Sequence, residues 1–293
     1  MELPLAKTGN EKVLLVEGGG MKGAFASGVL SAMCDYFPSR HFDLVVGVSS
    51  GTPPLAYYVT DSKLSDSNQK ILDIWKYDLI GNKFIAFRNV LKGKKIMNQK
   101  YLIDYLLKEK YPILIERLKS VDSTPFYIVV SDIKNATPRY IQATSENLFQ
   151  LLKAATSLPI VTQGMQYIDN LLLGDGAALD PIPIEHILEK GYKNITVILN
   201  QPLKTLSDPI NKLVSLIAYP VHREFRRRLR KLHHRNYNKA KEILINPPKD
   251  VTLSIIEPGD KSFLNLISTK KKEIHKMIHI GWKMGKSSFE IQR

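Results

Sequence analysis

Short apolar runs alternate along the chain with longer stretches in which apolar residues recur every three or four positions. The runs predict buried strands at residues 13–16, 44–48, 126–131, 171–173 and 195–199. The stretches between them predict helices, among them one ending near Tyr36, one beginning at Thr52 and several between residues 61 and 111. Strands that alternate with helices indicate a layered α/β fold.

The second of these strands ends in a G-x-S-x-G sequence centred on Ser49. A strand that stops abruptly and turns into a helix leaves the side chain at the turn standing free above the sheet edge. Gly47 and Gly51 leave room for that turn, so Ser49 is the predicted nucleophile. We expect Thr52 to cap the following helix and Ser50 to pack or cap nearby.

A glycine-rich turn follows the first strand, and three interpretations of it compete. A P-loop requires Gly-Lys followed by Ser or Thr, whereas Gly23 follows Lys22 here. A dinucleotide site requires an acid at the far end of the second strand, whereas Asp43 stands at its start. The third interpretation is an oxyanion hole, in which backbone N–H groups at a helix N-terminus face a developing negative charge. This predicted loop comprises Gly18, Gly19, Gly20, Met21, Lys22 and Gly23. Lys22 either adds positive charge there or is a solvated first-turn lysine.

A serine hydroxyl also needs a base that accepts its proton during attack. The chain has seven histidines, none of which has a convincing setting: His41, His186, His222, His233, His234, His275 and His279. Asp175 is the better candidate, because it ends an apolar strand and precedes Gly176 and Ala177, which leaves its carboxylate accessible. An ordinary turn is the alternative interpretation of Asp175-Gly176-Ala177.

The three motifs, in this order, resemble those of the patatin-like phospholipase family. Residues 153–159 and 179–184 are similar to further segments of that family, and the resemblance covers about residues 12–200. It implies a three-layer α/β/α fold with a mostly parallel central sheet. It also implies a Ser49–Asp175 dyad without a catalytic histidine, a lipid or phospholipid ester as substrate, and no cofactor. The family has a small residue after the second glycine of the nucleophile motif, where this chain has Thr52.

The resemblance also suggests how the chain is divided. We expect an N-terminal tail at residues 1–11, a catalytic domain at 12–200 and a basic, largely helical C-terminal extension at 201–293, packed on the same domain. The formal net charge is +14, and the last 93 residues carry 20 basic and 8 acidic side chains. Apolar residues 221, 225, 229 and 232 share one predicted helical face in this extension.

The basic side chains of that helix suit anionic lipid head groups, so we expect peripheral contact with a membrane surface and no nucleic-acid partner. The candidates for membrane contact are Arg223, Arg226, Arg227, Arg230 and Lys231. The alternative is a surface helix whose basic face is only solvated.

The sequence also favours several absences. The longest apolar stretch is interrupted by Ser, Gly and Pro, so no membrane-spanning segment is expected, and the N-terminus lacks the pattern of a signal peptide. Cys34 is the lone cysteine and fits a reducing compartment, which predicts a cytoplasmic protein, at most peripheral to the inner face of a membrane. No Cys/His cluster or paired-carboxylate loop suggests a metal site.

The leading hypothesis is therefore a lipid acyl hydrolase of the phospholipase A or lysophospholipase type that works through an acyl-enzyme. Two alternatives belong to other classes. One is a catalytically silent lipid- or nucleic-acid-binding protein on the same fold, and the other is a histidine-dependent α/β-hydrolase esterase.

Overall fold

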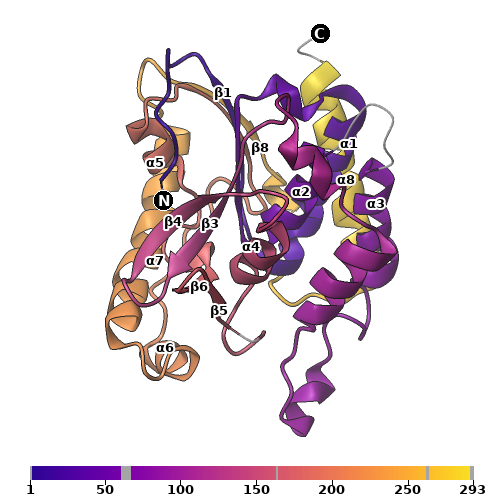
Figure 1. The fold of residues 1–293 in the computed structure, drawn as a ribbon, viewed down its shortest axis with the longest axis vertical. Coiled ribbons are helices and arrows are strands. Elements are labelled where there is room, and N and C mark those ends of the chain that lie inside the picture. Colours follow the sequence, from indigo (N-terminus) through magenta and orange to yellow (C-terminus); the bar gives the residue numbers. More distant parts are fainter. Residues whose placement is uncertain (1, 61–66, 163, 262–263, 291–293) are drawn as a thin grey trace.

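A mixed β-sheet runs through the centre of the computed structural model, which describes residues 2–60, 67–162, 164–261 and 264–290 (Figure 1). Within these residues the strand order is β5-β6-β3-β2-β1-β7-β8, and β4 also pairs with β3. The strands are β1 (Lys12–Val16), β2 (Leu44–Val48), β3 (Phe126–Asp132), β4 (Thr137–Gln142), β5 (Gln166–Ile168), β6 (Leu171–Asp175), β7 (Asn194–Ile198) and β8 (Thr252–Ile256). Five neighbouring strands are mutually parallel: β3, β2, β1, β7 and β8. Strands β4 and β6 pair antiparallel with β3, and β5 pairs antiparallel with β6.

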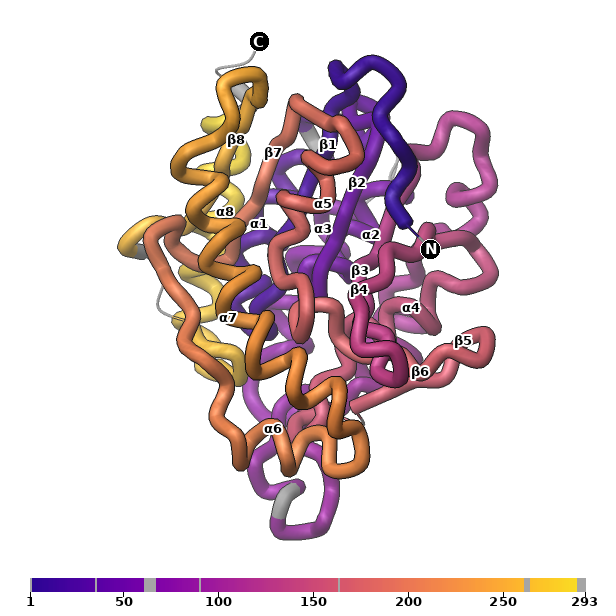
Figure 2. Tube along the Cα trace, turned by 90° about the vertical axis from the view of Figure 1, so that its left-hand side faces the viewer, coloured from indigo at the N-terminus to yellow at the C-terminus, as the bar shows by residue number. Residues whose placement is uncertain are grey.

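Helices cover both faces of the sheet, which confirms the predicted α/β class (Figure 2). They are α1 (Ala24–Tyr36), α2 (Thr52–Thr60), α3 (Ser67–Asp73), α4 (Leu148–Ala155), α5 (Ile184–Glu189), α6 (Lys212–Ala218), α7 (Arg223–Ile245) and α8 (Lys271–Glu290). Successive strand residues point to opposite faces, so Leu14 and Val16 of β1 join one core while Val13 and Leu15 join the other. The first core lies under α1–α4 and α8, and the second under α5 and α7.

Strand β3 determines where the candidate site forms. Its whole length from Tyr127 to Asp132 pairs with β4 along one edge. The other edge is shared, because β2 ends where Val48 pairs with Val129 and β6 ends where Asp175 pairs with Val130. Ser49, the residue after Val48, and Asp175 therefore meet end to end along one strand, although 126 positions separate them in the sequence.

The C-terminal residues are part of the same layers. Strand β8 extends the sheet beyond β7, so the segment at 201–293, expected to be largely helical, also contributes a parallel edge strand. Helix α8 packs closely along α1: a Cβ on Gly281 would lie 2.1 Å from the carbonyl oxygen of Phe25. Only glycine allows this approach of the two backbones.

Two local expectations need correction. Helix α2 begins at Thr52 as predicted, but Thr52 does not cap it: its hydroxyl donates to the carbonyl of Ser49 at 2.7 Å. Residue 221 was expected to share the apolar face of a helix with residues 225 and 229. Helix α7 begins only at Arg223, however, so Val221 lies outside the helix and is exposed, while Phe225 and Leu229 are buried as expected.

The helical cover expected at residues 61–111 is present from residue 67 onward, since residues 61–66 lie outside the described part. It consists of α3, π-helical turns at Ile74–Asp78 and Tyr101–Lys110, and a 3₁₀ segment at Phe87–Lys92. In the N-terminal tail, Leu3 is buried and the Ala6 N–H donates to the carbonyl of Lys190.

Gly281→Ala should destabilise the protein, because the added methyl group must displace the α1 backbone. Overpacking of this kind lowers the free energy of unfolding by about 1–3 kcal/mol. The midpoint of urea denaturation measures the change. His279→Ala, at an exposed position of the same helix, is the control and should leave the midpoint nearly unchanged. An unchanged midpoint for Gly281→Ala would contradict the close contact of α1 and α8.

Candidate active site

Ser49 stands at the turn between β2 and α2 in a conformation that side chains rarely adopt. Its φ is 50°, the left-handed region expected of a nucleophile elbow. The side chain is buried, and its hydroxyl donates to Oδ2 of Asp175 at 2.6 Å. Gly47, in β2, and Gly51, at the end of the turn, flank it as the motif predicts. Ser50 packs beside Gly23, and its buried hydroxyl has no hydrogen-bond partner among the described residues.

Asp175 is fixed in position from several sides. Its Oδ1 accepts the Ala177 N–H at 2.9 Å, and its carbonyl accepts the Ser131 hydroxyl at 2.8 Å. Its own N–H donates to the carbonyl of Ser157. Burial raises the pKa of the Asp175 carboxyl to about 7, and the hydrogen bonds from Ser49 and Ala177 act in the opposite direction. A carboxylate with this pKa accepts a proton more readily than an ordinary aspartate does.

The glycine-rich loop lies directly against the serine. A Cβ on Gly18 would come within 2.5 Å of the Ser49 Cβ, so no larger residue fits there. The backbone N–H groups of Gly18, Gly19 and Gly20 have no acceptor among the described residues. Those of Met21 and Lys22 are already bonded, to the carbonyls of Leu266 and Gly19. The donors available to an oxyanion are therefore the first three residues of the predicted loop.

A buried asparagine that the sequence analysis did not single out holds this loop. The Asn200 side-chain amide donates to the carbonyls of Glu17 and Gly18 and accepts the Ala26 N–H at 3.0 Å. The Glu17 carboxylate in turn accepts the Asn200 N–H at 2.6 Å. Burial raises the pKa of Glu17, and the charge of Lys241 acts against that shift. These bonds hold the carbonyls of Glu17 and Gly18 in place.

Lys22 is half-buried, and its ammonium group donates to Oε1 of Gln201 at 2.6 Å. Burial lowers its pKa, while the nearby Glu17 raises it. The lysine lines the same cleft as Ser49. Lys22 is thus neither free in solvent nor bonded to Ser49 in this structure, and it supplies a cation at the wall of the cleft.

Two hollows meet at Ser49. A narrow cavity of about 70 Å³ lies between α2, α3 and the π-helical segments. Its lining is mainly apolar and includes Tyr57, Ile71, Trp75, Leu79, Met97, Leu102 and Leu107. A wider cleft of about 460 Å³ contains Ser49, Asp175, Lys22 and residues of α6 and α7. Ser49 therefore lies between the narrow apolar cavity and the wider cleft, which contains polar groups.

One histidine lies closer to the site than the sequence suggested. Nδ1 of His233 on α7 is 2.8 Å from the carbonyl oxygen of Ala177, so this nitrogen carries the proton. Burial lowers the pKa of the ring, which favours the neutral form. His233 lines the wider cleft but bonds to the loop after Asp175 and not to Ser49. His233 precedes Asn236 and the buried Tyr237 by one helical turn, so these residues share one side of α7. This spacing is the feature of the sequence that could have placed His233 on the inner side of the helix.

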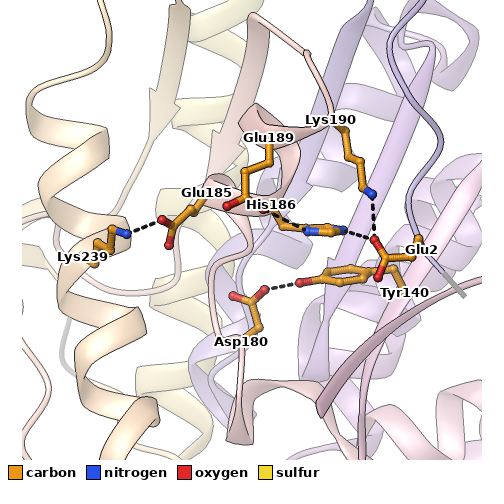
Figure 3. A network of polar contacts seen from close by, with 8 residues as sticks. All are labelled: Glu2, Tyr140, Asp180, Glu185, His186, Glu189, Lys190 and Lys239. Carbon is orange, nitrogen blue, oxygen red and sulfur yellow. Dashed lines mark hydrogen bonds and ion pairs between the residues drawn. The ribbon is translucent and has the colours of Figure 1, made fainter.

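A polar network behind the candidate site supports the loop that carries Asp175 (Figure 3). The Asp180 N–H donates to the carbonyl of Gly176 at 2.9 Å, and its partly buried side chain accepts the Tyr140 hydroxyl. Tyr140 stacks on His186 with ring centroids 4.0 Å apart. Ion pairs of Glu2 with Lys190 and of Glu185 with Lys239 join the tail to the end of α5 and α5 to α7. His186, whose pKa is lowered by burial, lies near the carboxylates of Glu2 and Glu189.

The five predicted membrane-contact residues lie on or near one side of α7 but differ in whether other groups of the protein already bind their charged ends. Arg223, Arg230 and Lys231 are exposed. Arg226 is held by the carbonyls of Tyr219 and Pro220, and Arg227 pairs with Glu224 at 2.8 Å. Among the described residues, no cluster of His, Cys, Asp and Glu that could hold a metal ion occurs. None of the described helices has the length and apolar character needed to cross a bilayer.

The mixed sheet thus brings a serine elbow, an adjacent aspartate and a glycine-rich loop together where its strands β1, β2 and β6 end. The profile of the family described as patatin-like phospholipase matches residues 14–188, and the chain belongs to this family. Membership supports lipid acyl hydrolase activity in general terms.

Two individual proteins are also similar. An uncharacterized protein of Escherichia coli K12, YjjU, is 22% identical over 262 residues, covering 84% of this chain and 68% of that protein. The crystal structure of VipD from Legionella pneumophila matches with a TM-score of 0.50 and 13% identity, covering 99% of this chain and 70% of VipD. The second likeness concerns the fold.

Tyr140→Phe tests the support of the Asp175 loop. Burial raises the pKa of Asp180 to about 6. Between the pKa of this carboxyl in the unfolded chain and about 6, the folded protein binds a proton that the unfolded chain has lost. The contribution of this group to stability therefore falls as pH rises through that range. Above it the native carboxylate is ionised and depends on the Tyr140 hydroxyl. Removing that donor should lower the free energy of unfolding by about 1–3 kcal/mol at about pH 8, and by less at about pH 5.

Urea denaturation at the two pH values measures this difference. Tyr77→Phe, at an exposed tyrosine, is the matched control and should have little effect at either pH. An equal loss at both pH values would show that the Tyr140 hydroxyl does not support the charged carboxylate.

Proposed function

We propose that the protein hydrolyses carboxylic esters of membrane lipids, as a phospholipase A or lysophospholipase, through a Ser49–Asp175 dyad and an acyl-enzyme intermediate. The observation that carries the proposal is the 2.6 Å hydrogen bond from the strained Ser49 to a buried aspartate whose pKa is raised to about 7. The family of the chain supports the same chemistry.

In the first half-reaction the Ser49 oxygen attacks the ester carbonyl carbon while its proton passes to Oδ2 of Asp175. The carbonyl oxygen becomes an oxyanion, which accepts hydrogen bonds from the otherwise unbonded N–H groups of Gly18, Gly19 and Gly20; their lack of an acceptor and the contact of Gly18 with Ser49 support this role. When the tetrahedral intermediate collapses, the ester C–O bond breaks and the leaving alcohol takes the proton from Asp175. The acyl group remains on Ser49.

In the second half-reaction a water molecule attacks the acyl carbon and gives a proton to Asp175. The Ser49 oxygen leaves, recovers the proton, and the free acid departs. No step requires an imidazole, because the serine hydroxyl already donates to the aspartate. His233 holds the Ala177 carbonyl and so helps position the loop next to the base.

The two hollows suggest how a lipid would lie across the serine. An acyl chain suits the narrow apolar cavity between α2, α3 and residues 97–107. The wider cleft contains Lys22, which suits the alcohol part of the substrate and an anionic head group. In this proposal the ester carbonyl lies between Ser49 and the N–H groups of Gly18, Gly19 and Gly20.

Loss of either dyad residue should abolish turnover. Ser49→Ala and Asp175→Asn should each lower kcat for a lipid or short-chain ester by about a thousandfold or more, because they remove the nucleophile or its proton acceptor. Labelling with a fluorophosphonate probe, located by mass spectrometry, should modify Ser49 only when Asp175 is present. Asp169→Asn makes the same charge change on the exposed β5–β6 turn and should retain full activity. Full hydrolysis by the Asp175→Asn protein would disprove the dyad.

The pH dependence should report the same aspartate. Asp175 acts as a base only when ionised, so kcat/KM should rise with pH through about 7, the pKa to which burial raises this carboxyl. A profile measured on a neutral short-chain ester avoids titration of the substrate. An acid limb near the pKa of ordinary aspartate would mean that the base is solvated during turnover.

A further inference from the structure

The short helix α6 presents an unusual number of apolar side chains to solvent. Leu213, Val214, Leu216 and Ile217 make up four of its seven residues, and each is at least 44% exposed. Leu206 before the helix and Val221 after it are also exposed, at 68% and 81%. Soluble proteins rarely leave such a group of large apolar side chains in water without a use for it.

The two sides of α6 have different surroundings. Val214, Ser215 and Ala218 line the wide cleft that contains Ser49 and Asp175. With 100° between successive residues, Leu213, Leu216 and Ile217 lie on the opposite side of the helix. The cleft therefore accounts for one side of α6 and leaves the outer apolar side unexplained.

A second exposed segment lies at the same end of the molecule. Figures 1 and 2 both place residues 87–95 and α6 at the lower end. Leu91 is 90% exposed and Phe87 is 50% exposed. At the base of this segment, Phe84 and Met97 line the narrow apolar cavity. Each of the two hollows that meet at Ser49 is thus bordered by one of the exposed apolar segments.

The charges around these apolar side chains are mainly positive. Residues 80–100 contain six basic and no acidic residues: Lys83, Arg88, Lys92, Lys94, Lys95 and Lys100. On the other segment Lys212 begins α6 and Arg223 begins α7, with Asp208 as the single acid between residues 206 and 223. Lys92, Lys94, Lys95 and Lys212 are exposed and form no ion pair with any residue that the structure describes.

We propose that residues 87–95 and 206–223 together form a docking face that binds an anionic lipid surface, with the outer side of α6 and Leu91 entering the interfacial layer. Apolar side chains ringed by unpaired cations match a bilayer whose head groups are negative and whose interior is apolar. A second copy of this chain would place like charges against each other. The face also borders the two hollows that meet at Ser49, which a lipid surface would supply with substrate and a tightly docked protein would close.

This docking face differs from the arginine-rich side of α7, where Arg226 and Arg227 are engaged within the protein. The reason for a lipid at these openings rests on the proposed function, but the binding itself does not require catalysis. It is therefore measured on full-length Ser49→Ala protein, which cannot consume the vesicles.

The experiment is co-sedimentation with vesicles of phosphatidylcholine alone and of phosphatidylcholine mixed with phosphatidylglycerol. Ser49→Ala protein should bind the mixed vesicles, more weakly as salt is raised. Adding Leu213→Asp with Ile217→Asp, or Lys92→Glu with Lys94→Glu and Lys95→Glu, should weaken binding by about tenfold or more. Val121→Asp is the matched control and should bind normally. Val121 is fully exposed and precedes the start of β3, so it lies at the end of the strands opposite to Ser49. Thermal denaturation verifies that each variant is folded.

Three results would overturn the proposal. One is the absence of binding to anionic vesicles by the folded Ser49→Ala protein. Another is loss of binding on Arg230→Glu with Lys231→Glu while the α6 variant binds normally, which would assign the contact to α7. The third is a dimer that dissociates in the α6 variant, which would make this face an interface between copies. Fluorophosphonate labelling of the protein that retains Ser49 tests the proposed function separately, so either can fail alone.

Discussion

The site depends on the way one strand is shared. Strand β3 pairs with β2 over its first half and with β6 over its second half, along the same edge. The end of one partner strand and the end of the other therefore abut, which brings Ser49 and Asp175 to 2.6 Å. Neither the elbow nor the aspartate loop achieves this alone. Any shift of register between β3 and β6 would move the carboxylate away from the serine.

Burial of this pair has opposing effects. Taking the Asp175 carboxyl out of water raises its pKa, which makes the carboxylate a better proton acceptor. The same burial lowers the stability of the folded protein when the carboxyl is ionised, because a buried charge loses its hydration. The Ala177 N–H compensates by donating to the carboxylate, and two further bonds fix the Asp175 backbone: the Ser131 hydroxyl donates to its carbonyl, and its N–H donates to the carbonyl of Ser157. A second, partly buried aspartate, Asp180, and its hydrogen-bonded Tyr140 hold the other end of the same short segment. The position of the candidate base thus depends on residues outside the motif.

The sequence predicted what local patterns encode. Apolar runs located β1, β2, β3, β6 and β7, and the elbow serine and the aspartate that ends β6 stand where their motifs placed them. It did not reveal Asn200, Tyr140 or His233 as supports, because their roles arise only when distant strands and helices meet. The antiparallel β4 and the edge strand β8 were also missed, and Thr52 looked like a cap although its hydroxyl turns back to Ser49. Period and spacing describe a segment, whereas pairing and burial depend on its partners.

The close packing of α8 on α1 has a consequence for how the protein is made. Helix α1 follows the glycine-rich loop and is synthesised well before α8, because most of the sheet lies between them in the chain. Until residues 266–290 have emerged from the ribosome, the side of α1 around Phe25 and Val29 has no cover, and the Met21 N–H lacks the carbonyl of Leu266 as its acceptor. The nascent chain therefore contains both residues of the candidate dyad well before its glycine-rich loop can settle, and the candidate site takes its final form only after α8 has been synthesised.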